Sequence, residues 1–215
     1  MRIRKTYAVL GLGRYGSAVA KELVANGLEV IAVDVNQRIV NDLAAHLPVC
    51  KCADVSDPEV IRRLGIGTID IVIISMANNL EASVMAVTLC KEAGAKMVIA
   101  KAANEMHQKI LRRVGADHVV FPERESGIRL AKNLLSSGFI DMISLSKDVS
   151  IIEIKVKDEW IGKNLIELNL RRQYGFNIIA TKSDGRVDVN IDPEETLGAD
   201  TTLIVIANTA NLKNL

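Results

Sequence analysis

The sequence predicts an α/β fold: a Rossmann-like, doubly wound parallel sheet followed by a small α+β domain. Three observations predict it. Short apolar runs of strand length alternate with helical patterns through the first part of the chain, which is typical of parallel sheets crossed by helices. Those runs are nearly continuous, as expected when both faces of a sheet are covered. From residue 149 onward polar and apolar residues alternate, as in strands with one solvated face.

The first domain, residues 1–136, is expected to hold six parallel strands with helices between them. Gly27, Gly94 and Gly115 each follow a helical pattern and end it, while Pro58 is expected at the first position of a helix. The expected strands are 6–11, 29–34, 49–53, 69–75, 97–101 and 118–121, and the expected helices are 17–26, 37–46, one beginning at Asp57, 79–93, 104–114 and 123–136.

The second domain, residues 149–215, is expected to follow a connector at residues 137–148. Asp184 and Gly185 are a hairpin turn signal between two of its strands. A domain of about 70 residues is near the lower limit for independent stability, so we expect it to pair with another copy. Its expected strands are 149–156, 177–182, 186–191 and 202–207, with a helix at 165–170.

The composition of the chain narrows the range of possible functions. Hydrophobic residues make up 49% of the 215, charged residues 25% and aromatic residues 3%, with a net charge of +1. A nucleic-acid partner is not expected, because phosphate backbones attract clustered basic residues and bases stack on aromatic rings. The longest apolar stretch, residues 69–77, is interrupted by Asp70 and is shorter than the ~18 residues of a membrane span. We therefore expect a cytoplasmic protein.

A glycine motif follows the first strand and opens the first helix. Gly11, Gly13 and Gly16 have the G-x-G-x-x-G spacing. The first glycine permits a tight turn, the second lets the backbone approach a phosphate, and the third lets helix and strand pack closely. Helix N–H groups then face the anion. The motif predicts a nucleotide-binding site.

Two carboxylates end neighbouring strands. Asp34 ends the second strand, where it can accept hydrogen bonds from ribose hydroxyls and would repel the 2′-phosphate of NADP. A helix cap is the alternative for Asp34. Asp54 ends the third strand and is expected either to contact the adenine or to form a cap before Ser56.

Arg14 lies between the second and third glycines. A guanidinium there suits a terminal phosphate, although the helix dipole disfavours a cation and a solvated side chain is the alternative. Lys101 is a second candidate cation, and residues 75–78 are expected to line the ligand.

Catalytic groups are not evident. Hydride transfer needs an acid or base beside the nicotinamide, but His46, His107 and His118 are expected to lie away from the crevice. Cys50, Cys52 and Cys90 have no zinc-like spacing. We therefore predict a sensor rather than an enzyme. An NAD(H)-dependent oxidoreductase or a standalone NAD(H) redox sensor is the alternative.

Several segments carry a family resemblance. YAVLGLGRYGSAVAKEL, VIAVDVN, ADVSDPEVIRRLGI, DIVIISMANNLEASV and GADHVVFPERESGIRLAKNLLS resemble the RCK-N domain of the KtrA/TrkA family, and IIEIKVKDEWIGKNLIELNLRRQYGFNIIATK resembles its RCK-C domain. The resemblance covers essentially the whole chain. It implies a regulatory subunit of a potassium uptake system, with dimers assembling into an octameric ring beneath a KtrB/TrkH-like membrane subunit. It also implies binding of ATP, ADP or NAD(H), and the placement of Arg14 favours ATP.

The same resemblance implies further sites. Glu123 matches a position that binds Mg²⁺ or Ca²⁺ between subunits, and a dipole-complementing acid at a helix start is the alternative. A cyclic di-AMP site is implied at Arg171, Asn177, Ile178 and Pro193. Arg172 would replace Arg171 if the register differs by one. The alternative is that these residues bind no ligand, with a solvated arginine at the helix end and ordinary strand packing. The expected nucleotide-binding residues are Gly11, Gly13, Arg14, Tyr15, Gly16, Asp34, Val35, Asn36, Asp54, Val55, Ser75, Met76, Ala77, Asn78, Lys101 and Glu123.

Overall fold

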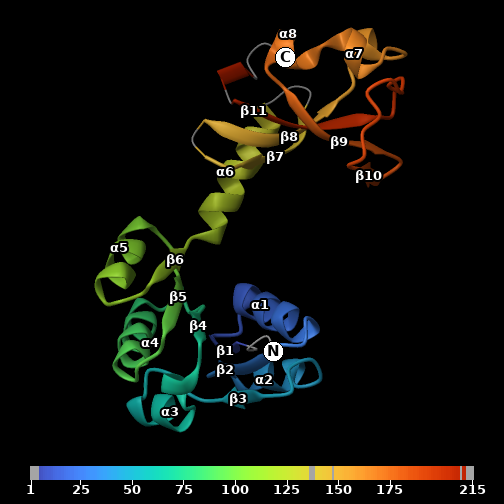
Figure 1. The fold of residues 1–215 in the computed structure, drawn as a ribbon. Coiled ribbons are helices and arrows are strands. Elements are labelled where there is room, and N and C mark those ends of the chain that lie inside the picture. Colours follow the sequence, from blue (N-terminus) through green and yellow to red (C-terminus); the bar gives the residue numbers. More distant parts are fainter. Residues whose placement is uncertain (1–4, 136–138, 147, 209, 212–215) are drawn as a thin grey trace. The chain divides into compact units, whose positions relative to one another are not determined.

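The structure is a computed structural model that describes residues 5–135, 139–146, 148–208 and 210–211 (Figure 1). The chain divides into two compact units, with the boundary in the sequence between Pro122 and Glu123. The first unit is built on a parallel sheet and the second on an antiparallel sheet. None of the described helices is long and apolar enough to cross a membrane.

The first unit has a six-stranded parallel sheet in the order β3-β2-β1-β4-β5-β6. The order reverses between β1 and β4, so the carboxyl ends of these two strands border the crevice where such folds bind ligands. The doubly wound sheet predicted from the sequence is confirmed. Its strands are β1 (Thr6–Leu10), β2 (Glu29–Asp34), β3 (Cys50–Cys52), β4 (Ile71–Ile74), β5 (Met97–Lys101) and β6 (His118–Val120).

Helices cover both faces of this sheet. One buried cluster joins Leu10 and Ile74 to residues of α3, α4 and α5, and the other joins Val9 to residues of α1 and α2. Helix α1 begins three residues earlier than expected, directly after Gly13, so the glycine motif forms the first turn itself. The helices are α1 (Arg14–Ala25), α2 (Gln37–Leu43), α3 (Pro58–Arg63), the 3-10 helix η1 (Ile66–Thr68), α4 (Leu80–Glu92) and α5 (Glu105–Arg113).

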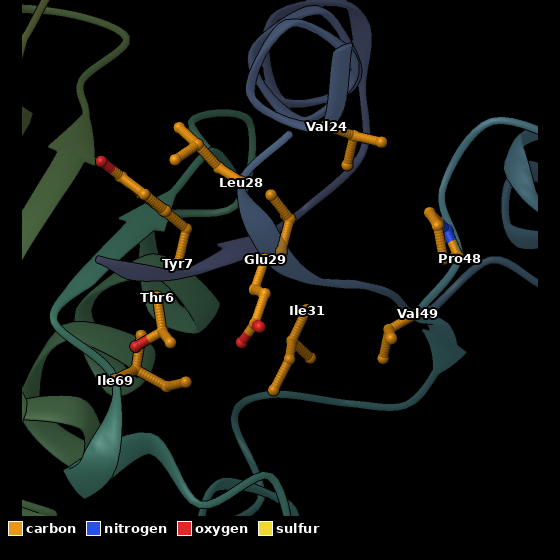
Figure 2. Close-up of a pocket in the computed structure, with 10 residues that line it drawn as sticks. Thr6, Tyr7, Val24, Leu28, Glu29, Ile31, Pro48, Val49 and Ile69 are labelled. Carbon is orange, nitrogen blue, oxygen red and sulfur yellow. The ribbon is translucent and has the colours of Figure 1, made fainter. Parts of the chain in front are cut away.

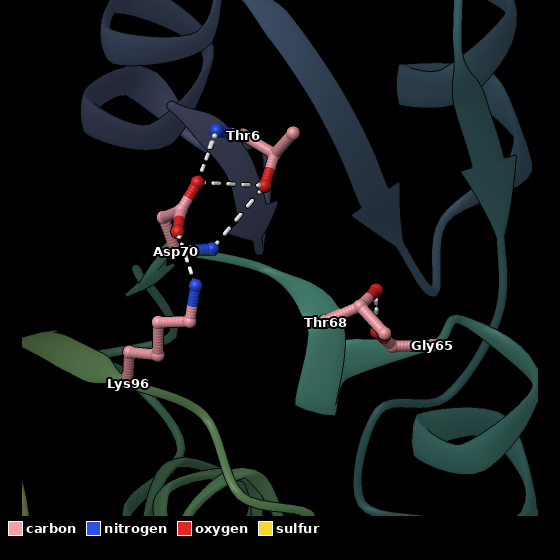
Figure 3. A network of polar contacts seen from close by, with 5 residues as sticks. All are labelled: Thr6, Gly65, Thr68, Asp70 and Lys96. Atoms are coloured by element: carbon pink, nitrogen blue, oxygen red, sulfur yellow. Dashed lines mark hydrogen bonds and ion pairs between the residues drawn. The ribbon is translucent and has the colours of Figure 1, made fainter. Parts of the chain in front are cut away.

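The amino ends of three strands are tied together by Asp70 (Figure 3). Its carboxylate accepts from the Thr6 backbone N–H at 2.9 Å, from the Thr6 hydroxyl at 3.2 Å and from Lys96 Nζ at 2.7 Å. The Asp70 N–H in turn donates to the Thr6 hydroxyl at 3.2 Å. The residue that interrupts the apolar stretch in the sequence therefore joins β1, β4 and the chain entering β5.

We expect Asp70→Asn to lower the free energy of unfolding and to flatten its dependence on pH in acid. Hydrogen bonds from Lys96, and next from Thr6, lower the pKa of Asp70 from 3.8 to about 2. The unfolded chain thus binds this proton more readily, so the contribution is complete above pH 3.8 and is lost as the pH falls toward 2. Denaturant unfolding across that window measures it, with exposed Asp42→Asn as the control. A pH slope like that of wild type would contradict it.

The second unit has a five-stranded antiparallel sheet in the order β10-β9-β11-β8-β7. One face packs against buried Trp160, Leu168 and Leu170. Its elements are α6 (Pro122–Leu135, which begins at the unit boundary), β7 (Phe139–Ser144), β8 (Val149–Lys155), the 3-10 helix η2 (Asp158–Trp160), α7 (Leu165–Leu168), α8 (Leu170–Tyr174), β9 (Asn177–Ser183), β10 (Arg186–Asp188) and β11 (Thr202–Asn208).

Two expectations for this unit were wrong in detail. The expected connector contains strand β7, which pairs antiparallel with β8 and forms an edge of the sheet. The expected start of that connector, at Ser137 and Gly138, lies outside the described residues. The single helix expected at 165–170 is two short helices, because Asn169 between them adopts a left-handed conformation with φ of 43°.

Candidate functional site

The glycine loop turns sharply at the carboxyl edge of the sheet. Gly11 has a φ of +90°, and its N–H donates to the Val33 carbonyl oxygen at 2.8 Å. A Cβ atom on Gly11 would lie 2.7 Å from Met76 Cγ. A Cβ atom on Gly16 would overlap the Gly11 carbonyl oxygen and lie 3.1 Å from Ser75 Cβ. The first and third glycines are therefore required by the packing of the fold.

Gly13 differs from both neighbours in the motif. Its φ is −62°, which any residue can adopt, and an added Cβ atom would meet nothing within 4 Å. The first backbone hydrogen bond of α1 runs from the Ser17 N–H to the Gly13 carbonyl oxygen, and no side chain caps the helix there. The start of α1, with exposed Arg14 as its first residue, therefore opens on a space that suits an anion.

Asp34 joins the glycine loop to the start of α2. Its Oδ2 accepts from the Leu12 N–H at 2.6 Å, and its Oδ1 accepts from the Asn36 N–H at 2.8 Å. Each carboxylate oxygen has further acceptor capacity, so ribose hydroxyls can still donate to it. The cap of α2 is Asn36, whose side chain accepts from the Arg38 N–H at 3.0 Å. Val35, between them, is 69% exposed.

The residues after β3 form a local turn. Asp54 Oδ1 accepts from the Ser56 backbone N–H at 2.9 Å and also from the Ser56 hydroxyl. These bonds, the hydroxyl first, lower the pKa of Asp54. These bonds form the turn that was one of the two roles expected for Asp54, before α3, whose own cap is Asp57. Contact of Asp54 with the adenine stays a prediction. Val55 is 4% exposed and packs in the core.

Two further strand ends approach the glycine loop. The Ser75 N–H donates to the Leu10 carbonyl oxygen at 2.7 Å, which holds residues 75–78 beside β1. Lys101 ends β5, and its Nζ lies 5.7 Å from the ring centroid of Tyr15 in the first turn of α1. This cation–π contact spans the point where the strand order reverses. The structure thus brings the glycine loop, the 75–78 loop and a cation together at one edge of the sheet.

Comparison with known proteins identifies the family. The TrkA-N domain model matches residues 7–122, and the TrkA-C domain model matches residues 149–215. The chain belongs to the TrkA family. It is 35% identical over 210 residues to the Ktr system potassium uptake protein C of Bacillus subtilis, covering 98% of this chain and 95% of that protein. It is 32% identical over 210 residues to the Ktr system potassium uptake protein A of Vibrio alginolyticus, covering 98% and 96%. The expected relationship to KtrA and TrkA proteins is confirmed.

Solved structures share the TrkA-family fold. The GsuK channel has a TM-score of 0.71 at 19% identity, covering 99% of this chain and 39% of that chain. The TrkA-N domain of the inner membrane protein YbaL of Escherichia coli has a TM-score of 0.54 at 19% identity, covering 61% and 98%. These likenesses concern the fold alone, and they agree with a Rossmann-like RCK-N domain followed by a small α+β RCK-C domain.

The remaining expected residues of this TrkA-family chain lie in the second unit. Glu123 is exposed at the second position of α6. Arg171 is exposed on α8, and Asn177 is exposed at the start of β9. Ile178 packs against the core of this unit, and Pro193 is exposed in the loop after β10. Among the described residues no three His, Cys, Asp or Glu side chains cluster as a metal site.

A cavity of about 320 Å³ lies at the opposite edge of the first sheet (Figure 2). Thr6 and Glu29, at the amino ends of β1 and β2, line it together with apolar side chains such as Leu28 and Pro48. The glycine loop follows the carboxyl end of β1, so this cavity is separate from the nucleotide crevice.

One buried contact was missed by sequence reasoning. His107 on α5 is 3% exposed and contacts both Ser83 in the first turn of α4 and the backbone of Ala103. It therefore joins the start of α4 to the loop that follows β5. His107 is four residues before buried Leu111, so both lie on the apolar face of α5. This helical spacing is the sequence signal that could have predicted the burial of His107.

Proposed function

We propose that this chain is a cytoplasmic regulatory subunit of a potassium uptake system, which binds an adenine nucleotide in its first domain and acts on a membrane potassium-translocating partner. Family membership supports the potassium uptake role, since the relatives at 35% and 32% identity are named for it. The observation that carries nucleotide binding is the open start of α1 at Gly13, with the Asp34 carboxylate beside the same loop. The role needs binding and no chemistry.

ATP and ADP are the proposed ligands, with NAD(H) as the other candidate. Arg14 at the start of α1 and Lys101 over Tyr15 place two cations near the expected phosphate position. Two cations suit the concentrated charge of a terminal phosphate better than the diphosphate bridge of NAD(H). Asp34 would repel the 2′-phosphate of NADP.

The proposed assembly is an octameric ring of dimers on the membrane subunit. A ligand shifts a conformational equilibrium only by its differential affinity for the two states. Coupling of about 1–3 kcal/mol per site is typical, and several coupled sites in a ring would add to a larger effect on the partner. Light scattering with each nucleotide measures the assembly.

Two further ligands are proposed from family resemblance. Glu123 would bind Mg²⁺ or Ca²⁺ together with the same residue of another copy, since one carboxylate is a poor site alone. Cyclic di-AMP would bind at Arg171, Asn177, Ile178 and Pro193, where the guanidinium would pair with a phosphate. Calorimetric titration of the wild-type protein with each of these ligands decides both proposals.

We expect Arg14→Ala to weaken ATP about tenfold more than ADP, because a charge-assisted contact to the terminal phosphate is lost. Calorimetry with ATP, ADP, NAD⁺ and NADH measures it. Lys21→Ala, an exposed cation further along α1, is the control and should leave all affinities unchanged. Equal losses of affinity for ATP and ADP would show that Arg14 does not contact the terminal phosphate. A wild-type protein that binds none of the four nucleotides would contradict the proposed function.

A further inference from the structure

The protonation state of His107 follows from its neighbours. Its Nε2 lies 2.8 Å from the Ser83 hydroxyl oxygen, and its Nδ1 accepts from the Ala103 backbone N–H at 3.3 Å. The single Ser83 hydroxyl proton is donated to the Leu80 carbonyl oxygen at 2.8 Å. Ser83 must therefore accept from the imidazole, which places the one ring proton on Nε2. Only the neutral Nε2–H tautomer satisfies every group in this network.

The network joins the start of α4 to the loop that follows β5. Ser83 lies in the first turn of α4, directly after the 75–78 loop that contacts β1. Ala103 lies two residues after Lys101, whose Nζ is over the Tyr15 ring. His107 and Ser83 are 3% and 1% exposed, so this bridge is buried. The backbone that carries Lys101 is thereby tied to the start of α4.

Protonation would break one of these contacts. A second proton on Nδ1 would face the Ala103 N–H, and two donors cannot share a hydrogen bond. Burial lowers the pKa of His107, in agreement with a bridge that depends on the neutral ring. The charged residues within three sequence positions of Ser83, Ala103 or His107 are Glu81 on α4, Lys101 at the end of β5, and Glu105 and Lys109 on α5.

We propose that His107 is a positioning residue for the nucleotide crevice: its neutral ring holds the 101–104 loop, and with it Lys101, against the start of α4, and protonation releases that loop. The inference rests on the proposed binding of a nucleotide at this crevice. Affinity is then constant while the ring is neutral and falls as acid protonates it, which is the direction set by the lowered pKa of His107.

The test compares ATP affinity at about pH 8 and about pH 5.5, the range in which histidine changes charge. His107→Asn places an amide oxygen where Nδ1 accepts from Ala103 and cannot titrate there. His118→Gln, at the exposed start of β6, removes a histidine outside the network. Dividing wild-type affinity by that of His107→Asn at each pH cancels titration of the ATP phosphates themselves.

We expect this ratio to fall between the two pH values, by at most about tenfold, because each pH unit below the pKa costs up to tenfold and the pKa of His107 is lowered from 6.5. His118→Gln should follow wild type. Identical pH profiles for wild type and His107→Asn would overturn the inference while leaving nucleotide binding intact, whereas absent ATP binding at the higher pH would overturn the proposed function and the inference with it.

A measurement on wild-type protein without nucleotide keeps the inference testable if His107→Asn does not fold. Nitrogen-15 NMR of the imidazoles should show His107 as the Nε2–H tautomer, with His46 and His118 as exposed references. Its protonation should coincide with faster amide hydrogen exchange at Ala103. The proposed bridge would be overturned if the His107 ring carried its proton on Nδ1. It would also be overturned if the amide exchange rate of Ala103 did not change when His107 is protonated.

Discussion

Gly16→Ala is expected to destabilise the first domain by at least about 2 kcal/mol, because an added methyl group has no space there. Its Cβ atom would overlap the carbonyl oxygen of Gly11 and lie 3.1 Å from Ser75 Cβ. The first obstacle is backbone rather than a flexible side chain, so α1 must move away from β1. That movement also displaces the start of α1, where the phosphates are proposed to bind. Stability and nucleotide affinity should therefore fall together.

Gly13→Ala separates the two effects. The Gly13 backbone conformation is open to alanine, and the new methyl group would meet no protein atom within 4 Å. Alanine is a poorer N-cap than glycine, which costs under about 1 kcal/mol of stability. The methyl group would instead occupy the space through which a phosphate approaches the backbone, so we expect nucleotide affinity to fall at least about tenfold.

Denaturant unfolding and nucleotide calorimetry on the same two variants decide between packing and binding roles. The expected pattern is loss of both properties in Gly16→Ala, and loss of binding with at most a small loss of stability in Gly13→Ala. Wild-type affinity for ATP and ADP in Gly13→Ala would show that no phosphate lies at the start of α1. Wild-type stability in Gly16→Ala would show that the helix yields without cost.

The order of elements in the first domain could be predicted because its strands are buried on both faces and its helices end at glycines. The elements of the second domain were harder to predict, because the differences between the predicted and observed elements depend on single residues. Strand β7 has an irregular pairing between Phe139 and Asp141, so no clean alternation marks it in the sequence. The break between α7 and α8 depends on the left-handed conformation of Asn169, which propensity alone does not specify.

Some features of the candidate site could likewise be predicted from the sequence, and others could not. The glycines and Asp34 were predictable, since their spacing follows from the geometry of a strand, turn and helix. The bond from the Leu12 N–H to Asp34 was not, because it depends on how the glycine loop meets the end of β2 in space. The bridge from His107 to Ser83 joins residues 24 positions apart, and only the packing of α4 against α5 creates it.

Asp34→Ala is expected to cost both stability and nucleotide affinity. The carboxylate accepts from the N–H of Leu12, a residue only 2% exposed, and from the N–H of Asn36. Removing the acceptor leaves a donor in the glycine loop without a partner, which typically costs about 1–3 kcal/mol. The loss of the proposed ribose contacts should weaken every adenosine nucleotide by about 1.5–3 kcal/mol more, the range for hydrogen bonds to charged groups.

Asp34→Asn distinguishes the structural contribution from the ligand contribution. Its amide keeps one oxygen that can accept from Leu12, the shorter of the two bonds at 2.6 Å, while the amide nitrogen is a donor and cannot accept from a ribose hydroxyl. We therefore expect Asp34→Asn to recover part of the stability lost in Asp34→Ala and to stay weak for ATP, ADP and NAD(H). Asp54→Ala, which removes a carboxylate bound only to its own turn among the described contacts, should bind nucleotides much more tightly than either variant. Undiminished ATP and ADP binding in Asp34→Ala would remove the ribose assignment, and Asp34 would then act only by holding the glycine loop against α2.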